Sequence, residues 1–192
     1  MNKKQTQDVI IIGGGISGSA LMYMLAQYTD IKNIMLLEKY ASIATVNSHG
    51  RNNSQTLHCG DIETNYTLDK ARQVQQSANM VLRYAKTLKN KDEVLHKFSK
   101  MVIGVGDKEV AQLRERFTQF SPHYPGMQLL EREQINKIEP AVIAGRKENI
   151  VALGVVDDYS AVNFQALSES FVENAVAVKN KNVELKLDTK VE

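Results

Sequence analysis

The chain reads Asp8-Val9-Ile10-Ile11-Ile12-Gly13-Gly14-Gly15-Ile16-Ser17-Gly18 close to its amino terminus. The apolar, β-branched run before the glycines predicts a buried strand of a parallel sheet. Gly13 allows a tight turn, Gly15 lets a pyrophosphate approach the backbone, and Gly18 lets the next helix pack closely on the strand. The stretch therefore predicts a strand, a phosphate-binding turn and a helix.

The residues after the glycines complete this pattern. Apolar side chains recur at helical spacing up to about residue 28, at Ile16, Ala20, Leu21, Met24 and Leu25. A second short strand, residues 34–37, ends at Glu38, which lies 20 residues after Gly18. A dinucleotide site needs a carboxylate here for the adenosine ribose, and that carboxylate repels a 2′-phosphate. The sequence therefore predicts a site for NAD or FAD rather than NADP.

Composition excludes several classes of protein. The chain has 192 residues, of which 43% are hydrophobic, so it can bury a core of ordinary size. Its formal net charge of +2 is too small and dispersed for a nucleic-acid partner. Cys59 is the single cysteine, which suits a reducing compartment, and no histidine pair has the spacing of metal ligands. No apolar run is long enough for a membrane span or a signal peptide, so we expect a cytoplasmic protein without a metal.

Strands and helices are mixed along the rest of the chain, which predicts an α/β fold. The expected helices are 69–89, 108–120 with Asp107 as its cap, 131–138 and 163–178, and the expected strands are 101–106, 128–130 and 151–156. Between them, residues 41–68 form a long polar segment that leaves from the end of the second strand, where open α/β sheets bind ligands. Its many short donors and acceptors suit a flavin, and the alternative is a solvated surface loop.

The carboxy-terminal residues also carry an expectation. Residues 183–192 alternate between apolar and polar side chains as a strand does, and they stop without a turn or a cap. Native domains usually cover such an exposed sheet edge. We therefore expect a piece of a longer protein, cut inside a domain; the alternative is a strand that happens to end the chain.

A family resemblance begins in the first stretch. Lys39 follows Glu38, and residues 13–39 resemble the opening of the FAD-dependent amine and hydroxy-acid oxidoreductases of the D-amino-acid oxidase type. In that superfamily a glycine triplet precedes the helix, and a Glu-Lys or Glu-Arg pair closes the second strand. The resemblance implies FAD as the cofactor. It also implies a Rossmann-like FAD-binding domain of the glutathione-reductase type with part of an α+β substrate domain, truncated.

The polar segment narrows the resemblance. It reads Asn52-Asn53-Ser54-Gln55-Thr56-Leu57-His58, then Glu63, then Asn65-Tyr66-Thr67. This resembles the malate:quinone oxidoreductases, whose loop reads Asn-Asn-Ala-Gly-Thr-Gly-His before a glutamate and Asn-Tyr-Thr. Gln55 and Leu57 stand where that pattern has glycines. The segment also resembles the L-2-hydroxyglutarate oxidoreductases, which have Asn-Ser-Gly, an apolar residue and His-x-Gly here.

Both resemblances imply a cofactor site. Its expected members are Gly13, Gly15, Ile16, Ser17, Gly18, Glu38, Lys39, Ser48, Asn52, Asn53, Ser54, Thr56 and Val191. Residues 155–164 resemble the stretch of these flavoproteins in which a strand of the substrate region returns to the FAD domain through a helix. In those proteins a valine of the strand after that helix contacts FAD through its backbone, and the corresponding residue here is Val191.

The resemblances also imply a reaction. A 2-hydroxy acid gives hydride to flavin N5 while a base takes the hydroxyl proton. His58 is placed for the base, because imidazole accepts a proton near neutral pH; it could instead hydrogen-bond the flavin or the substrate carboxylate. His49 is the next candidate.

The implied function is oxidation of (S)-malate to oxaloacetate with FAD, with a membrane quinone as electron acceptor and a peripheral position on the inner face of the cytoplasmic membrane. The alternatives are oxidation of L-2-hydroxyglutarate or a related 2-hydroxy acid, and a noncatalytic dinucleotide-binding fragment. A nicotinamide-linked enzyme would be supported by a second G-x-G-x-x-G, and none is present. We expect the chain alone to be inactive. Its expected domains are 1–68 for the start of the FAD-binding domain, 69–156 for part of the substrate domain, and 157–192 for the return to the FAD-binding domain.

Overall fold

The computed structural model describes residues 6–192, apart from the side chain of Asp157. The chain forms two compact units, each built from separate segments. The described part of the first unit comprises residues 6–56, 88–94 and 162–192, and the second unit comprises residues 57–87 and 95–161. The expected boundaries were 68/69 and 156/157, whereas the chain passes between the units at 56/57 and 161/162 and also makes an excursion at 88–94.

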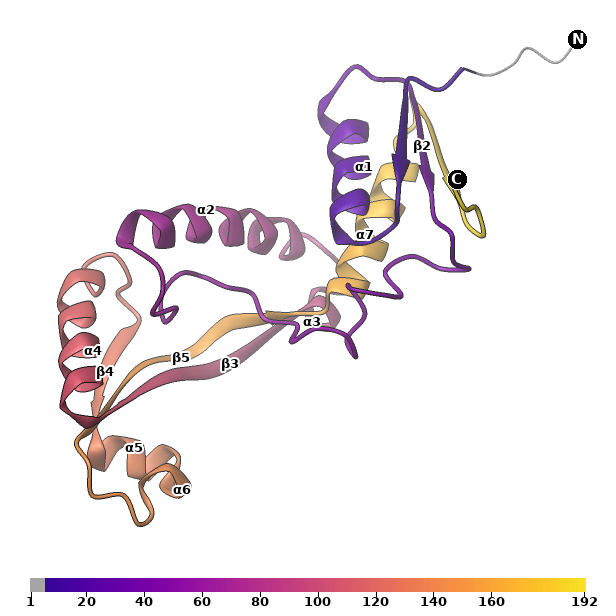
Figure 1. Cartoon of the computed structure of the whole chain (residues 1–192). Helices are drawn as coiled ribbons and strands as arrows, with labels where there is room; N and C mark the ends of the chain where they lie inside the picture. Colours follow the sequence, from indigo (N-terminus) through magenta and orange to yellow (C-terminus); the bar gives the residue numbers. More distant parts are fainter. Residues whose placement is uncertain (1–5) are drawn as a thin grey trace, which may run out of the picture. The chain divides into compact units, whose positions relative to one another are not determined.

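The first unit is a parallel α/β layer, as the glycine-rich stretch predicts. Its three strands lie in the order β1-β2-β6, and both strand pairs are parallel (Figure 1). The strands are β1 (Val9–Ile12), β2 (Asn33–Leu37) and β6 (Asn182–Lys186), and the helices are α1 (Ile16–Tyr28), α3 (Lys91–Val94) and α7 (Phe164–Val176). Helix α1 connects β1 to β2, so the predicted βαβ unit is confirmed.

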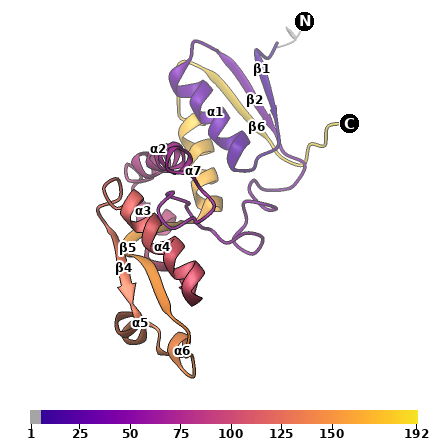
Figure 2. The same ribbon diagram turned by 60° about the vertical axis from the view of Figure 1, so that its left-hand side comes forward.

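Burial in this sheet is one-sided, which corrects the expectation of a fully buried first strand. Ile11 is only 6% exposed and packs with residues of α1 and α7, whereas Ile10 is 54% exposed and Ile12 is 68% exposed. Successive side chains of a strand point to opposite faces, so the apolar run of β1 is split between them. The two helices cover the face to which Ile11 points (Figure 2).

Helix α1 has the predicted bounds, but its buried face is different. The residues that it buries are Ser19, Met22 and Ala26, whereas Leu21 and Met24 are exposed. Since apolar residues lie all around this helix, their spacing did not identify the face that packs. Small side chains at Ser19 and Ala26 allow close contact with neighbouring elements.

The carboxy-terminal strand is shorter than expected, because β6 ends at Lys186 instead of running to residue 192. Asp188 adopts a left-handed conformation with φ +48°, which turns the chain out of the sheet. The backbone N–H of Thr189 then donates to the carbonyl of Glu38 over 2.8 Å. The last residues therefore return to the chain that follows β2, and Val191 lies outside the strand.

The second unit contains an antiparallel strand pair and four helices. Its sheet has the order β3-β5-β4, and β4 and β5 are antiparallel. The strands are β3 (Leu95–Val105), β4 (Met127–Glu131) and β5 (Ile150–Val162), and the helices are α2 (Leu68–Ala85), α4 (Gly106–Phe120), α5 (Arg132–Ile138) and α6 (Pro140–Ile143). Figure 2 shows α4 beside the strands. Leu113 and Phe120 of α4 belong to one buried cluster with Val151 and Leu153 of β5.

Several bounds in this unit differ from those predicted. Both long strands exceed the predicted ranges, because β3 begins at Leu95 and β5 continues to Val162. Helix α4 begins at Gly106, so Asp107 lies in its first turn and is not its cap. Instead, the carboxylate of Glu109 accepts from the backbone N–H of Val105 over 2.8 Å. Within residues 6–192, no helix combines the length and the apolar character needed to cross a membrane.

Candidate functional site

The turn between β1 and α1 has the geometry of a phosphate-binding turn. Gly13 has φ +100°, a conformation that side-chain-bearing residues rarely adopt, and its N–H donates to the carbonyl of Leu37 over 2.8 Å. A Cβ on Gly18 would lie 2.0 Å from the carbonyl oxygen of Gly13. The helix can therefore pack this closely on the turn only with glycine at position 18, as the sequence predicts.

Glu38 is tied to this turn by its carboxylate. The side chain is buried, its Oε2 accepts from the N–H of Gly14 over 2.7 Å, and its Oε1 accepts from the N–H of Tyr40 over 3.1 Å. A carboxylate oxygen can accept two hydrogen bonds, so each oxygen keeps capacity for a further donor. The Glu38 carboxylate can therefore accept hydrogen bonds from the hydroxyl groups of a ribose.

Gly14 is a part of this site that the sequence analysis did not assign. A Cβ there would lie 2.7 Å from the side chain of Ile43 and 3.2 Å from Glu38 Oε2. Its carbonyl also accepts from the N–H of Ala44 over 3.0 Å. The sequence signal for its role is its place in the middle of three consecutive glycines, and in the structure position 14 faces the chain that follows β2.

Ser48 closes the amino-terminal end of α1. Its buried hydroxyl oxygen accepts from the N–H of Ile16 over 3.0 Å, while the N-cap residue Gly15 has no side chain for this purpose. The first N–H groups of a helix lack partners within the helix and attract anions. Ser48 therefore holds the polar segment against the part of α1 at which a phosphate would bind.

A cavity of about 500 Å³ in the first unit lies beside the glycine turn, Glu38 and Ser48. Six of the predicted cofactor residues line it, namely Gly13, Gly15, Glu38, Lys39, Ser48 and Val191. Tyr40, Thr189 and Lys190 also line it and were not predicted. Thr189 and Lys190 were missed because the carboxy-terminal segment reaches the cavity only after it turns out of the sheet at Asp188.

The other predicted cofactor residues lie outside this cavity. Ile16, Ser17 and Gly18 form the first turn of α1 and its contact with β1, whereas the side chains at Asn52, Asn53, Ser54 and Thr56 belong to the irregular segment. Asn52 Nδ2 donates to the carbonyl of Val46 over 2.8 Å, and Asn53 Oδ1 accepts from the N–H of Gln55 over 2.7 Å. These contacts order the segment, and a role in cofactor binding stays a prediction.

Gln55 shows how the segment tolerates a departure from glycine. Its φ of +54° lies in the left-handed region, which glycine adopts more readily than other residues. Its carbonyl accepts from the N–H of Val162, and its side-chain oxygen accepts from the N–H of Phe164, each over 2.8 Å. The glutamine therefore keeps a backbone turn of the kind that glycine favours and anchors it to the start of α7.

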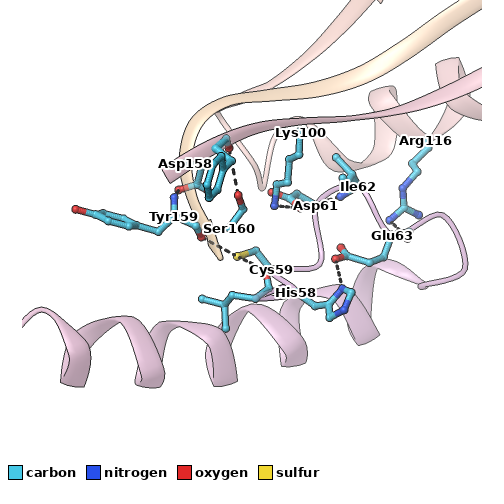
Figure 3. A network of polar contacts seen from close by, with 12 residues as sticks. His58, Cys59, Asp61, Ile62, Glu63, Lys100, Arg116, Asp158, Tyr159 and Ser160 are labelled. Carbon is cyan, nitrogen blue, oxygen red and sulfur yellow. Dashed lines mark hydrogen bonds and ion pairs between the residues drawn. The ribbon is translucent and has the colours of Figure 1, made fainter. Parts of the chain in front are cut away.

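His58 lies in the second unit, within a polar network drawn in Figure 3. Its Nδ1 is 2.9 Å from Glu63 Oε1. The His58 side chain is 57% exposed, whereas the Glu63 side chain is 14% exposed. His58 also borders a small hollow that it shares with α2 residues such as Lys70 and Gln73.

Arg116 of α4 supports the loop that carries Glu63. Its Nη2 donates to the carbonyl of Glu63 over 2.6 Å, and its Nη1 donates to the carbonyl of Tyr66 over 2.9 Å. The guanidinium also lies 3.7 Å from the centre of the Phe120 ring. Among the described residues, Glu63 Oε2, Arg116 Nε and the Tyr124 hydroxyl are buried without a hydrogen-bond partner.

A second ion pair fixes the same loop to β3. Lys100 Nζ lies 2.8 Å from Asp61 Oδ1, and both side chains are largely buried. Burial alone would lower the pKa of Lys100, but its hydrogen bond and ion pair with Asp61 outweigh burial, so the pKa is raised.

Beside this pair, burial raises the pKa of the Cys59 thiol to about 11, so the thiol is protonated near neutral pH. Within residues 6–192, no cluster of three His, Cys, Asp or Glu side chains is arranged to hold a metal ion.

The parallel βαβ unit, its glycine turn and the buried carboxylate at the end of β2 define a dinucleotide-binding α/β protein. Its fold matches the FAD-bound L-α-glycerophosphate oxidase of Mycoplasma pneumoniae, with a TM-score of 0.67 and 23% identity, over 97% of this chain and 46% of that one. The family model of the malate:quinone oxidoreductases matches residues 5–192. The chain belongs to the malate:quinone oxidoreductase family.

Curated relatives agree with this family. The chain is 44% identical over 187 residues to a probable malate:quinone oxidoreductase of Campylobacter jejuni subsp. jejuni, covering 93% of this chain and 42% of the relative. It is 41% identical over 180 residues to the malate:quinone oxidoreductase of Helicobacter pylori, covering 91% of this chain and 40% of the relative. The chain thus spans less than half the length of these proteins.

Proposed function

We propose that the chain belongs to an enzyme that oxidises (S)-malate to oxaloacetate with FAD and passes the electrons to a quinone. The observation that carries the proposal is the family match over residues 5–192. The cavity beside the glycine turn and Glu38, where this fold binds a dinucleotide, supports it. The names of the two bacterial relatives support malate and quinone as the substrates. Oxidation of L-2-hydroxyglutarate or of a related 2-hydroxy acid is the competing activity.

The residues of the first unit fit the adenosine half of FAD. A Cβ on Gly13 would meet no atom within 4 Å, Gly15 has only the Ser48 hydroxyl near its missing Cβ, and Glu38 offers acceptors for the ribose. Ser17 would add its backbone N–H to the pyrophosphate, Ile16 would lie beside it with its N–H bonded to Ser48, and Lys39 and Val191 would border the adenine side. Bound FAD would supply the two-electron chemistry by accepting hydride from the carbon that bears the substrate hydroxyl.

His58 is the proposed proton acceptor for that hydroxyl. Its ring is more than half exposed, so a nitrogen atom can reach a substrate. The carboxylate of Glu63 stabilises the positive charge that the ring gains with the proton. Asn52, Asn53, Ser54 and Thr56 are proposed to contact the flavin from the irregular segment.

The electron acceptor is proposed to be a membrane quinone, which the enzyme would meet as a peripheral protein on the inner face of the cytoplasmic membrane. Quinones are apolar and stay in the bilayer, so the site of their reduction must come close to the membrane surface.

The experiment uses the full-length protein, its absorbance spectrum and several substrates. We expect a yellow protein whose flavin band is bleached by (S)-malate and recovers on addition of a quinone analogue. L-2-Hydroxyglutarate, (R)-malate and glycerol 3-phosphate serve as controls for substrate and stereochemistry. A colourless protein that needs NAD would overturn the proposal, and faster bleaching by L-2-hydroxyglutarate would favour the competing activity.

A further inference from the structure

The contact between Glu63 and His58 bears on which nitrogen of the imidazole ring carries the hydrogen. The distance of 2.9 Å between His58 Nδ1 and Glu63 Oε1 is that of a hydrogen bond. An ionised carboxylate has no hydrogen to donate, so a hydrogen bond between it and a neutral imidazole requires the ring hydrogen on Nδ1. The ring nitrogen that remains, Nε2, then carries the lone pair and is the basic atom of the neutral ring.

Glu63 is held in place independently of His58. Arg116 binds the carbonyl of Glu63 (Figure 3) and that of Tyr66, so the loop from Glu63 onward is fixed to α4, while the Asp61–Lys100 ion pair fixes the residues before it to β3. The Arg116 guanidinium is itself held against the Phe120 ring. The acceptor therefore has a defined position, and the exposed imidazole adapts to it.

Glu63 also has few other donors for its charge. Its Oε2 is buried and has no hydrogen-bond partner among the described residues, and the Lys100 ammonium forms its ion pair with Asp61. A buried carboxylate oxygen without a donor costs free energy, so the carboxylate gains most from the single N–H that His58 supplies. Rotation of the imidazole away from Glu63 would remove this bond.

We propose that Glu63 is a positioning residue that holds His58 as the Nδ1–H tautomer and presents Nε2 as the basic nitrogen. This inference rests on the proposed function for its catalytic consequence. The hydroxyl proton of the 2-hydroxy acid passes to Nε2. The carbon that bears this hydroxyl gives its hydride to bound FAD, and the substrate becomes the 2-oxo acid. The imidazolium then lies beside the carboxylate, which offsets its charge.

The tautomer is tested by NMR on the full-length protein with ¹⁵N-labelled histidine, where the His58 signals are those lost in His58→Gln. We expect a protonated Nδ1 and an unprotonated Nε2 in the neutral ring of the wild type. In Glu63→Gln the amide can donate as well as accept, so we expect the Nδ1–H form to lose its excess. A neutral wild-type ring protonated at Nε2, or the same tautomer ratio in Glu63→Gln, would overturn the proposal.

Kinetics provide the second measurement. Glu63→Gln should lower kcat for malate at least about tenfold with little change in KM or in flavin content. Glu63→Asp should recover part of the loss, because it restores a carboxylate. Glu133→Gln makes the same substitution at an exposed site in α5 and should behave as the wild type. Unchanged kcat in Glu63→Gln would contradict the inference.

The two proposals fail in different ways. If the wild-type protein does not oxidise malate, the proposed function is wrong, and the NMR spectrum still decides whether Glu63 fixes the tautomer. If malate is oxidised but His58→Ala turns over as the wild type, His58 is not the base and the catalytic consequence for Glu63 is overturned.

Discussion

Glu38 combines a structural and a binding role in one buried carboxylate. Two backbone N–H groups, those of Gly14 and Tyr40, already donate to it, so it shapes the turn before any ligand arrives. These donors stabilise the charge that a ribose diol would meet. The residue therefore prepares the site as well as contacting the cofactor.

The first prediction is that Glu38→Ala weakens FAD binding about 10- to 100-fold, since it removes a charge-assisted acceptor worth about 1.5–3 kcal/mol. Fluorescence titration of the apoprotein with FAD measures the affinity. Glu169→Ala, at an exposed position of α7, is the matched control. Equal affinities for Glu38→Ala and the wild type would remove Glu38 from the site.

The second prediction concerns Cys59 and alkaline pH. Burial raises the pKa of its thiol from 9.0 to about 11 in the folded chain. Above pH 9 the thiol of the unfolded chain ionises while the folded one stays protonated, so stability that is present below pH 9 is lost as the pH rises toward about 11. Urea unfolding at pH 8 and pH 10 should therefore show a smaller decrease in the free energy of unfolding for Cys59→Ala than for the wild type. Parallel decreases in the two proteins would contradict this.

At the scale of elements, the contact between β1 and α1 depends on the absence of a side chain at position 18. A Cβ there would lie 2.0 Å from a backbone oxygen of Gly13, and the turn is held in place by the hydrogen bonds of Gly13 to Leu37 and of Gly14 to Glu38. The strand, the turn and the helix are thus one packing unit.

The third prediction is that Gly18→Ala destabilises the protein by about 1–3 kcal/mol, because overpacking at a close contact forces the backbone to shift. Thermal unfolding followed by circular dichroism measures the change. Gly50→Ala makes the same substitution where no atom lies within 4 Å of the added Cβ, and it should leave the melting temperature nearly unchanged. Similar losses in both variants would show that the contact at Gly18 is not the cause.

Elements defined by short-range patterns could be predicted, and those defined by distant pairings could not. The glycines and Glu38 lie within one βαβ unit, so spacing along the chain placed them correctly. The end of β6 could not be predicted in this way, because the alternation of side chains continues past Asp188 while the backbone leaves the sheet there. The pairing of His58 with Glu63 lies in an irregular loop, where no periodicity indicates which side chains meet.

At the scale of the molecule, a chain that leaves the first unit and later returns to it was expected from the sequence, but the points at which it crosses differ from those expected. The first unit takes in residues 88–94 from the middle of the chain, and the polar segment is divided after Thr56. Long-range contacts decide such divisions, and composition along the chain gives no sign of them. The proposed cofactor residues up to Thr56 consequently lie in the first unit, whereas His58, Glu63 and Arg116 lie in the second.

The fourth prediction follows from this division: cofactor affinity and turnover should respond to variants of different units. His58→Ala should lower kcat for malate about 10²- to 10⁴-fold, the usual contribution of a general base, with FAD affinity unchanged. Glu38→Ala should lower FAD affinity, with kcat nearly that of the wild type once FAD saturates the protein. The double variant should lose FAD affinity as much as Glu38→Ala does and kcat as much as His58→Ala does, because the two groups act on separate steps. Flavin titration and malate turnover on the four proteins test this; loss of FAD from His58→Ala would mean that the second unit also holds the cofactor.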